Sequence, residues 1–283
     1  MTTKLRVLTW NLNVMSRHLE IKRQLLGNFD WDVIALQEAR PEDIAELKLH
    51  LHGDCVFRRD DERRAERDYG SALFVSDRHA VKAHGLVEQA PWRERAVWAD
   101  ITLAGGAAVR VISFHSPNGT GQGGQQKMDH YEAVHNFVAA HDGPQVLAMD
   151  ANSSWDCWPA EDEEVWAKRA NNAKEGIWRW DRLLLAPDAL KAPEERHGLR
   201  DAWRDVLEAD RDRTERLRAR RPYGPTGVTI ANTMYGRVGP HRYDLIYVTD
   251  HFGVDDVTHH FDDAVAARSN HALVEAQLTL TAF

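Results

Sequence analysis

Short apolar runs bordered by a polar or charged side chain are the feature that most constrains the fold of this chain. Six such borders are spread over the sequence, at Asn11, Glu38, His115, Asp150, Asp244 and His271. A buried carboxylate without a partner costs several kcal/mol, so polar groups beside buried strands need an ion or one another. A single one has an ordinary explanation, such as a turn cap or a satisfied interior histidine. Six together predict that distant strands bring these side chains to one shared site.

The apolar runs predict many strands with helices between them. Strand-length runs occur at Lys4–Trp10, Trp31–Gln37, Gly70–Ser76, Arg95–Leu103, Val109–His115, Gln145–Met149, Tyr243–Thr249 and His271–Thr281. Helical spacing is found around Ile21–Leu26, Ile44–Leu51 and Met128–Val138. This pattern indicates an α/β (α+β) chain in which two mixed sheets pack together under covering helices. No repeat or linker divides the sequence, so we expect a single domain over residues 1–283.

Two segments stand out from this pattern. Residues 155–205 are expected to form an insertion in which five tryptophans fall within 26 positions, namely Trp155, Trp158, Trp166, Trp178 and Trp180. Packing explains most of these rings, and a platform for stacking bases is the functional alternative. The run Arg211–Arg221 holds six arginines, opposed by Asp212 and Glu215. It is either a solvated helix face or a contact for a phosphate backbone.

Composition excludes several classes of protein. The hydrophobic fraction of 43% and charged fraction of 28% are ordinary for a globular chain and exclude a collagen, a coiled coil or a disordered protein. The net charge of −8 argues against a broad basic face that coats DNA, although a local arrangement of charge and bound divalent cations still permit a nuclease. Only Cys55 and Cys157 occur, and no export signal or membrane-spanning stretch is evident, so we expect a cytoplasmic protein.

The residue types at the strand borders suit the cleavage of phosphate esters. The carboxylate of Glu38 and the amide of Asn11 are hard oxygen donors, which Mg²⁺ or Mn²⁺ prefer. A zinc site is the weaker interpretation because no cluster of Cys and His has zinc spacing. An Asp–His pair from separate strands can orient an imidazole, and a second histidine can protonate the departing oxygen while the metal neutralises the developing charge.

The order of these motifs resembles the endonuclease/exonuclease/phosphatase superfamily, which includes deoxyribonuclease I, abasic-site endonucleases, sphingomyelinases and inositol polyphosphate 5-phosphatases. The similar segments run from residue 5 to residue 278. The resemblance implies a deoxyribonuclease I-like four-layer sandwich, with two packed mixed sheets flanked by helices and a metal-dependent site at the top of the sheets. His115 differs from the abasic endonuclease branch, which generally carries Tyr at that position.

The resemblance also implies roles for individual residues. Asn11 and Glu38 belong to the metal site, with Glu38 as the principal ligand, and Glu94 supports His115, the candidate general acid. Asp150 and Asn152 match the Gly-Asp-x-Asn motif, whose members position the attacking water and a phosphate oxygen. Asp244 orients His271, the C-terminal catalytic histidine of the family. Arg95 and Asn118, beside these motifs, are candidate substrate-binding residues, and the division of acid and base roles between the two histidines stays open.

Two positions depart from the family pattern. Met149 replaces the usual Gly before Asp150, a tolerable packing change. Asn270 stands in Ser269-Asn270-His271 where the family usually has Asp. The amide of Asn270 offers an oxygen ligand without a negative charge, so metal affinity should be lower. This substitution is natural tuning, a damaged site or an engineered change that slows turnover.

These observations predict a hydrolase, most simply a divalent-metal-dependent phosphodiesterase of nuclease type. Its substrate is a phosphate ester, with DNA and RNA as candidates, and endo or exo mode and oligomeric state stay open. The first alternative is a phosphatase that acts on an inositol phosphate, a nucleotide or another small phosphorylated metabolite, which suits an acidic protein. The second is a non-catalytic binding protein whose metal site Asn270 has weakened.

Overall fold

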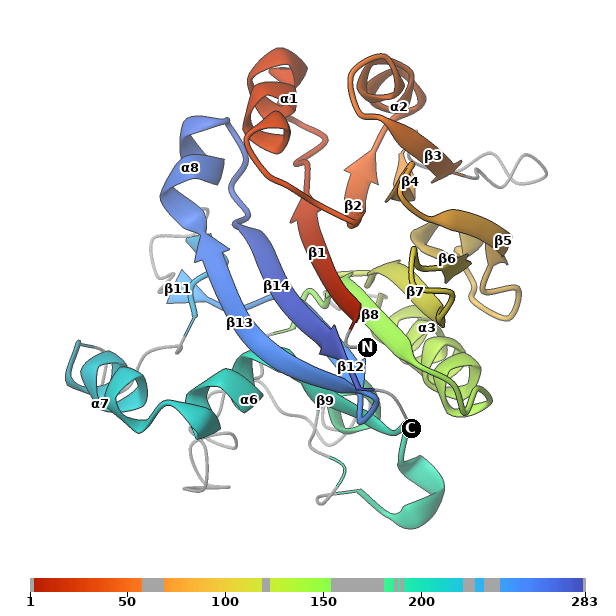
Figure 1. Ribbon diagram of the computed structural model, residues 1–283, viewed down its shortest axis with the longest axis vertical. Coiled ribbons are helices and arrows are strands. Elements are labelled where there is room, and N and C mark those ends of the chain that lie inside the picture. The colour runs from red at the N-terminus through yellow and green to blue at the C-terminus, as the bar shows by residue number, and fades with distance from the viewer. Residues whose placement is uncertain are drawn as a thin grey trace.

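Two six-stranded mixed β-sheets form the centre of the computed structural model, which describes residues 3–57, 69–118, 123–153, 181–185, 188, 191–220, 227–231 and 240–281 (Figure 1). The first sheet has the strand order β13 (Phe252–His260), β14 (Leu273–Leu280), β1 (Thr3–Asn11), β2 (Val33–Ala39), β4 (Gly70–Ser76) and β3 (Gly53–Phe57). The second has the order β5 (Ala80–Leu86), β6 (Ala96–Thr102), β7 (Ala108–His115), β8 (Gln145–Asp150), β12 (Asp244–Thr249) and β9 (Leu199–Asp201).

Each sheet contains one parallel pair of strands, and a helix connects the members of that pair. In the first sheet β1 and β2 are parallel and α1 (Leu19–Gly27) lies between them in the chain. In the second sheet β7 and β8 are parallel and α3 (Gly123–Ala139) connects them. The other pairings are antiparallel. Because parallel strands end at the same edge, each βαβ unit delivers two strand ends to one edge of its sheet.

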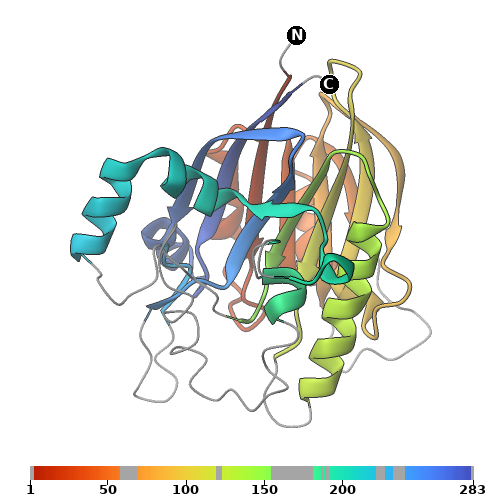
Figure 2. The ribbon, with the colours of Figure 1, turned by 90° about the horizontal axis from the view of Figure 1, so that it is seen from below.

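Alternation of side chains along the strands builds three apolar layers. The inner layer packs the sheets against each other through residues such as Val7, Val33, Val111 and Val146. The outer face of the first sheet, which includes Trp10, is covered by α1, α2 (Pro41–Lys48) and α8 (Phe261–Ala266). The outer face of the second sheet is covered by α3 and by the short turn η2 (Asp181–Leu185), and Figure 2 shows α3 along its side. The result is a four-layer sandwich.

The remaining elements are short. They are the turns η1 (Arg93–Arg95) and η4 (Pro193–Glu195), the small sheet of β10 (Ile230–Ala231) and β11 (Pro240–His241), and the helices α6 (Ala202–Ala209) and α7 (Arg211–Arg220). Helix α7 lies at the periphery in both views (Figures 1 and 2). In the described part of the chain, no helix is both long and apolar enough to cross a membrane.

The expected fold class is confirmed, and each expected strand lies within two residues of an observed one at either end. The sequence patterns did not predict β3, β5, β9 or β13, nor helices α6 to α8. The tryptophan-rich part of the expected insertion, Trp155 to Trp180, lies outside the described residues. Its end, Leu199–Asp201, pairs with β12 as the edge strand of the second sheet.

Candidate active site

Six side chains meet where the two sheets present their strand ends. The first sheet contributes Asn11 from the end of β1, Glu38 from β2, and His271 from the segment that enters β14. The second contributes residues of β7, β8 and β12, and pairing alone brings them together: His115 lies opposite Asp150, which lies opposite Asp244. Adjacent strands are about 4.8 Å apart. The strand register therefore determines half of the site.

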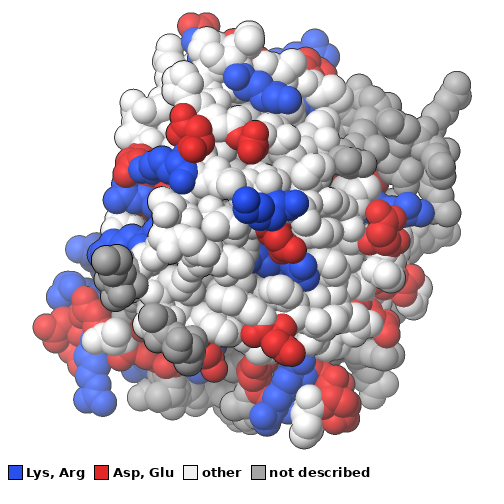
Figure 3. All heavy atoms as spheres, turned by 45° about the vertical axis from the view of Figure 1, so that its right-hand side comes forward, with Lys and Arg blue, Asp and Glu red and all other residues white. Residues whose placement is uncertain are grey.

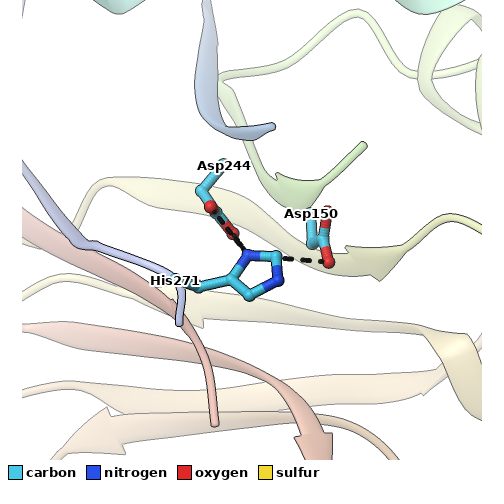
Figure 4. A group of neighbouring side chains, drawn as sticks. All are labelled: Asp150, Asp244 and His271. Carbon is cyan, nitrogen blue, oxygen red and sulfur yellow. Dashed lines mark hydrogen bonds and ion pairs between the residues drawn. The ribbon is translucent and has the colours of Figure 1, made fainter. Parts of the chain in front are cut away.

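His271 and Asp244 form the best-defined pair. Nδ1 of His271 lies 3.0 Å from Oδ2 and 3.1 Å from Oδ1 of Asp244, so the imidazole donates Nδ1–H to the carboxylate (Figure 4). The indole N–H of Trp10 donates to the carbonyl oxygen of His271 at 3.1 Å, and Ser269 Oγ donates to the carbonyl of Asn11 at 2.8 Å. Burial alone would lower the pKa of His271, but Asp244 and Asp150 outweigh it and raise the pKa to about 9. The imidazole is therefore cationic at neutral pH.

Asp150 is 1% exposed and lies between the two sheets. Its Oδ2 accepts from the amide of Asn11 at 2.8 Å, and its Oδ1 accepts from the backbone N–H of Asn152 at 2.9 Å. The same Oδ2 lies 4.0 Å from Nδ1 of His271. Burial raises the pKa of Asp150; His271 opposes the shift and Asp244 adds to it. A carboxylate with a raised pKa is a stronger base than an exposed one.

His115 faces three groups of the site through Nε2. This atom lies 3.6 Å from Asp150 Oδ2, 3.8 Å from Glu38 Oε1 and 3.2 Å from the amide nitrogen of Asn152. The same amide nitrogen donates to the carbonyl oxygen of Ser116 at 2.8 Å, which fixes which end of the Asn152 side chain is nitrogen. Because that nitrogen can only donate, Nε2 of His115 accepts in this arrangement.

Glu38 is the carboxylate of the site that solvent reaches. Its side chain is 20% exposed, and Oε2 accepts from the backbone N–H of Val14 at 2.8 Å. Within the described residues, Oε1 of Glu38 accepts no hydrogen bond. It lies 3.8 Å from Nε2 of His115, on the side of the site where Asp150 also lies. A partly exposed carboxylate oxygen with a vacant lone pair, next to a second carboxylate, fits a hard divalent cation such as Mg²⁺ or Mn²⁺.

Asp150, Asp244 and His271 are also close enough to share an ion, since each offers a ligand atom within 4.8 Å of the others. Both oxygens of Asp244, however, face the Nδ1–H of a cationic imidazole. We therefore interpret Asp244–His271 as a hydrogen-bonded acid–base pair, and Glu38 as the residue whose geometry best suits a metal. The side-chain nitrogen of Asn11 donates to Asp150, and Oδ1 of Asn11 accepts from the backbone N–H of Asn13.

Unusual backbone conformations concentrate at this site. Among the described residues other than glycine, φ is positive at Asn13 (53°), Glu38 (53°), Asn152 (46°) and Arg268 (67°). For Glu38 and Arg268 the left-handed conformation costs about 1–3 kcal/mol and persists where surrounding contacts impose it, whereas asparagine, as at Asn13 and Asn152, adopts it more readily. All four belong to the segments that carry the site. The chain thus stores local strain where it positions polar groups.

The other candidates from the sequence lie around this centre. Glu94 and Arg95 are buried in η1, and Arg95 is 7% exposed. Its guanidinium donates to the Tyr69 hydroxyl at 3.2 Å and lies 4.7 Å from the centre of the Trp92 ring. The Tyr69 ring stacks at 6.2 Å from that of His115, which links Arg95 to the site. Asn118 and Asn270 are exposed.

Three buried residues that support the site were not identified from the sequence. Thr229 Oγ1 accepts from the backbone N–H groups of Tyr243 and Asp244, at 2.7 and 3.0 Å. Lys22 donates to the carbonyls of Leu12 and Ser16, which flank the turn that holds Glu38.

Lys127 donates to the carbonyl of Asn152 at 2.8 Å. The sequence could have indicated that Lys127 and Lys22 are buried, because each lies in a helical segment and has apolar neighbours at helical spacing. No pattern marks Thr229, whose role depends on tertiary contacts.

Comparison with known proteins agrees with this architecture. A family model described as Endonuclease/Exonuclease/phosphatase family matches residues 8–271, whereas a search of curated proteins gave no significant match. Among solved structures, the endonuclease/exonuclease/phosphatase from Bacteroides vulgatus has a TM-score of 0.65 and 16% identity, over 99% of this chain and 100% of its own. The TDP2 of D. rerio, complexed with single-strand DNA product, has a TM-score of 0.65 and 15% identity over 98% and 99% of the two chains.

A truncated TDP2 from Caenorhabditis elegans has a TM-score of 0.60 and 16% identity, over 97% of both chains. At these identities the structural likeness establishes a shared fold, the deoxyribonuclease I-like sandwich. The family model spans most of the sequence, from the end of β1 to His271. The chain belongs to the endonuclease/exonuclease/phosphatase family.

Proposed function

We propose that this protein is a divalent-metal-dependent phosphodiesterase of nuclease type. The observation that carries the proposal is the meeting of a solvent-accessible carboxylate, Glu38, with a buried carboxylate, Asp150, and a cationic imidazole, His271, at one edge of the two sheets. Hydrolysis of a phosphate diester needs charge neutralisation, a base for water and a proton for the departing oxygen. These three groups supply those requirements.

In this proposal Glu38 is the principal metal ligand, and Asn11 and Asn270 contribute amide oxygens. A bound Mg²⁺ or Mn²⁺ would neutralise the charge that develops on the phosphoryl group. The residues fit such an ion because the donors are oxygens and Glu38 Oε1 is accessible. The amide of Asn270 adds no charge, so the affinity should be modest.

The proposed chemistry then depends on which side chains accept and donate the transferred protons. Asp150, with its raised pKa, accepts a proton from the attacking water, and the amide nitrogen of Asn152 holds Nε2 of His115 in position. His271, kept cationic by Asp244, donates through Nε2 to a phosphate oxygen or to the leaving oxygen. His115 is the second candidate for that donation, with Glu94 as its support, and it would have to take up a proton at Nε2, which accepts from Asn152 in the structure.

A polynucleotide is the proposed substrate. TDP2 of D. rerio was solved with a single-strand DNA product, and it shares the fold over nearly the whole chain. Arg95 and Asn118 beside the centre are the proposed phosphate contacts, and α7 adds further arginines. On the face in Figure 3, basic side chains are interspersed with acidic ones, so binding would depend on a local arrangement of charge.

The test is an activity panel of substrates and metals. We expect cleavage of bis(p-nitrophenyl) phosphate and of DNA or RNA with Mg²⁺ or Mn²⁺, abolished by EDTA and by His271→Ala. Release of inorganic phosphate from monoesters, without cutting of diesters, would instead identify a phosphatase, which the net charge of −8 suits. Binding of phosphate esters without any turnover would identify a non-catalytic protein.

A further inference from the structure

Lys127 is a buried cation that contacts the backbone of the candidate site. It belongs to α3, is 2% exposed, and donates from Nζ to the carbonyl oxygen of Asn152 at 2.8 Å. Its ammonium lies 5.5 Å from the centre of the Tyr131 ring. One helical turn later, the hydroxyl of Tyr131 donates to the preceding carbonyl, that of Ala151, at 2.6 Å. Helix α3 therefore holds two successive carbonyls of the turn that follows β8.

This turn needs external support because of its conformation. Asn152 has a φ of 46°, in the left-handed region, which asparagine adopts more readily than most residues but which lies outside the main allowed conformations. The side chain then directs its amide nitrogen at the Ser116 carbonyl (2.8 Å) and at Nε2 of His115 (3.2 Å). A rotation about the N–Cα bond of Asn152 would move its carbonyl away from Lys127 and its side-chain amide away from His115 together, because both groups are attached to the same Cα. The position of the amide thus depends on the ammonium.

We infer that Lys127 is a positioning residue, which acts on the reacting groups through Asn152 and sets the contact between that amide and His115. The expected effect on kcat rests on the proposed function, whereas the expected effect on the contact between Asn152 and His115 does not. A buried ammonium carries a large desolvation cost, so a role in chain folding alone would be met more cheaply by a neutral donor.

The chain uses such a neutral donor at the opposite end of the same strand. Gln145 begins β8 and is 1% exposed, and its side-chain nitrogen donates to the carbonyls of Val138 at 3.0 Å and His141 at 2.8 Å. It therefore fastens the end of α3 to β8 as Lys127 fastens the beginning, without a charge. Gln145 lies far from the site along the strand and offers a matched control.

The experiment compares Lys127→Met, Lys127→Arg and Gln145→Met in the full chain. With bis(p-nitrophenyl) phosphate and Mg²⁺, we expect Lys127→Met to lower kcat by about 10- to 100-fold while KM changes little, because a misplaced group costs rate at constant binding. Lys127→Arg should restore most of kcat, since it keeps a cationic donor. Gln145→Met should lower the melting temperature but leave kcat near that of the wild type.

A second readout separates this inference from the proposed function. The ¹⁵N chemical shift of His115 Nε2 reports its hydrogen bond with Asn152 whether or not the protein turns over substrate. We expect this shift to change in Lys127→Met, to be retained in Lys127→Arg and to be unaffected in Gln145→Met. An unchanged shift in folded Lys127→Met would overturn the inference, as would an unchanged kcat in an active protein. If Lys127→Met does not fold, Lys127→Gln is judged by the same criteria.

Discussion

Nδ1 of His271 lies 3.0 Å from Oδ2 of Asp244, and the two residues come from different sheets of the sandwich. Thr229 links them from outside the sheets, since it accepts from the backbone N–H of Asp244 and its carbonyl accepts from the N–H of Ala272. Both residues are buried, with Asp244 0% and His271 6% exposed. The geometry of the pair directs Nδ1–H of the cationic imidazole at Asp244 and leaves Nε2–H for the substrate.

Replacing Asp244 by Asn should therefore preserve shape and remove the function of the pair. The amide no longer stabilises a cationic imidazole, and we expect kcat on a diester substrate to fall by about 10²- to 10⁴-fold with a smaller change in KM. Asp100→Asn is the control, because that carboxylate pairs with Arg110 at 2.7 Å at the other end of the second sheet. Equal rates for the two variants would contradict the role of Asp244.

Glu38→Gln tests the metal site. The amide keeps the oxygen that accepts from Val14 but removes the negative charge, so the Mg²⁺ concentration for half-maximal rate should rise by at least about tenfold. Titration of the rate with Mg²⁺ measures this. Glu20→Gln, at an exposed position in the first turn of α1, provides the comparison. If the two variants require the same Mg²⁺ concentration as the wild type, Glu38 is not a ligand.

Asn270→Asp should act in the opposite direction. Asn270 is exposed beside His271, and a carboxylate there would add a charged oxygen donor. We expect a higher rate or a lower Mg²⁺ requirement in the same titration. Unchanged metal dependence and rate would show that this side chain does not reach the ion.

Acid should destabilise the fold through its buried neutral histidines. Burial lowers the pKa of His130 to about 3, and burial also lowers the pKa values of His197 and His259 well below the ordinary value of 6.5. The unfolded chain takes up protons below pH 6.5 while these folded sites do not. Stability that is complete above pH 6.5 is therefore lost as the pH falls from 6.5 toward 3, by up to about 1.4 kcal/mol per pH unit for each histidine.

Urea unfolding at pH 7.5 and pH 5 measures this loss. In the wild type, the backbone N–H of Trp92 donates to Nε2 of His130 at 2.8 Å. His130→Gln keeps an acceptor for this N–H and removes the group that takes up a proton in acid. Its stability should fall less steeply with acid than that of the wild type. His271 has the opposite effect on the pH dependence of stability. Its pKa is raised to about 9, so its contribution to stability is complete below pH 6.5 and is lost as the pH rises through 9. Identical slopes for His130→Gln and wild type would refute the assignment.

The sequence predicted the parts of the fold that have a strong period. The runs that became β2, β4 and β8, and the later halves of β1 and β7, are mostly apolar on both faces because both faces are buried. Strands β5 and β13 were missed since many of their residues are exposed or half-buried and polar, as in the run Val254–Thr258. Helix α7 has almost no apolar face, so helical periodicity could not reveal it.

The candidate site was predictable to the extent that it follows strand ends. Six polar borders were identified, and the structure brings all six to one edge. The supports of the site were not predictable, because Lys22, Lys127 and Thr229 act on backbone carbonyls and N–H groups whose positions depend on the tertiary fold. The positive φ of Glu38 leaves no mark in the sequence for the same reason, whereas asparagine, as at Asn13 and Asn152, is a residue type that favours this conformation.

Neither sheet carries a complete set of the groups that the proposed reaction needs. The spacing between Glu38 and Asp150, or between Asp244 and His271, is therefore an offset between two stacked surfaces, and the apolar side chains between them, such as Val146 and Val274, act as its spacer. Enlarging or trimming that layer would change the distance between the two halves of the proposed catalytic set. We therefore expect that substitutions buried in this interior, without any polar atom, alter turnover in the proposed reaction.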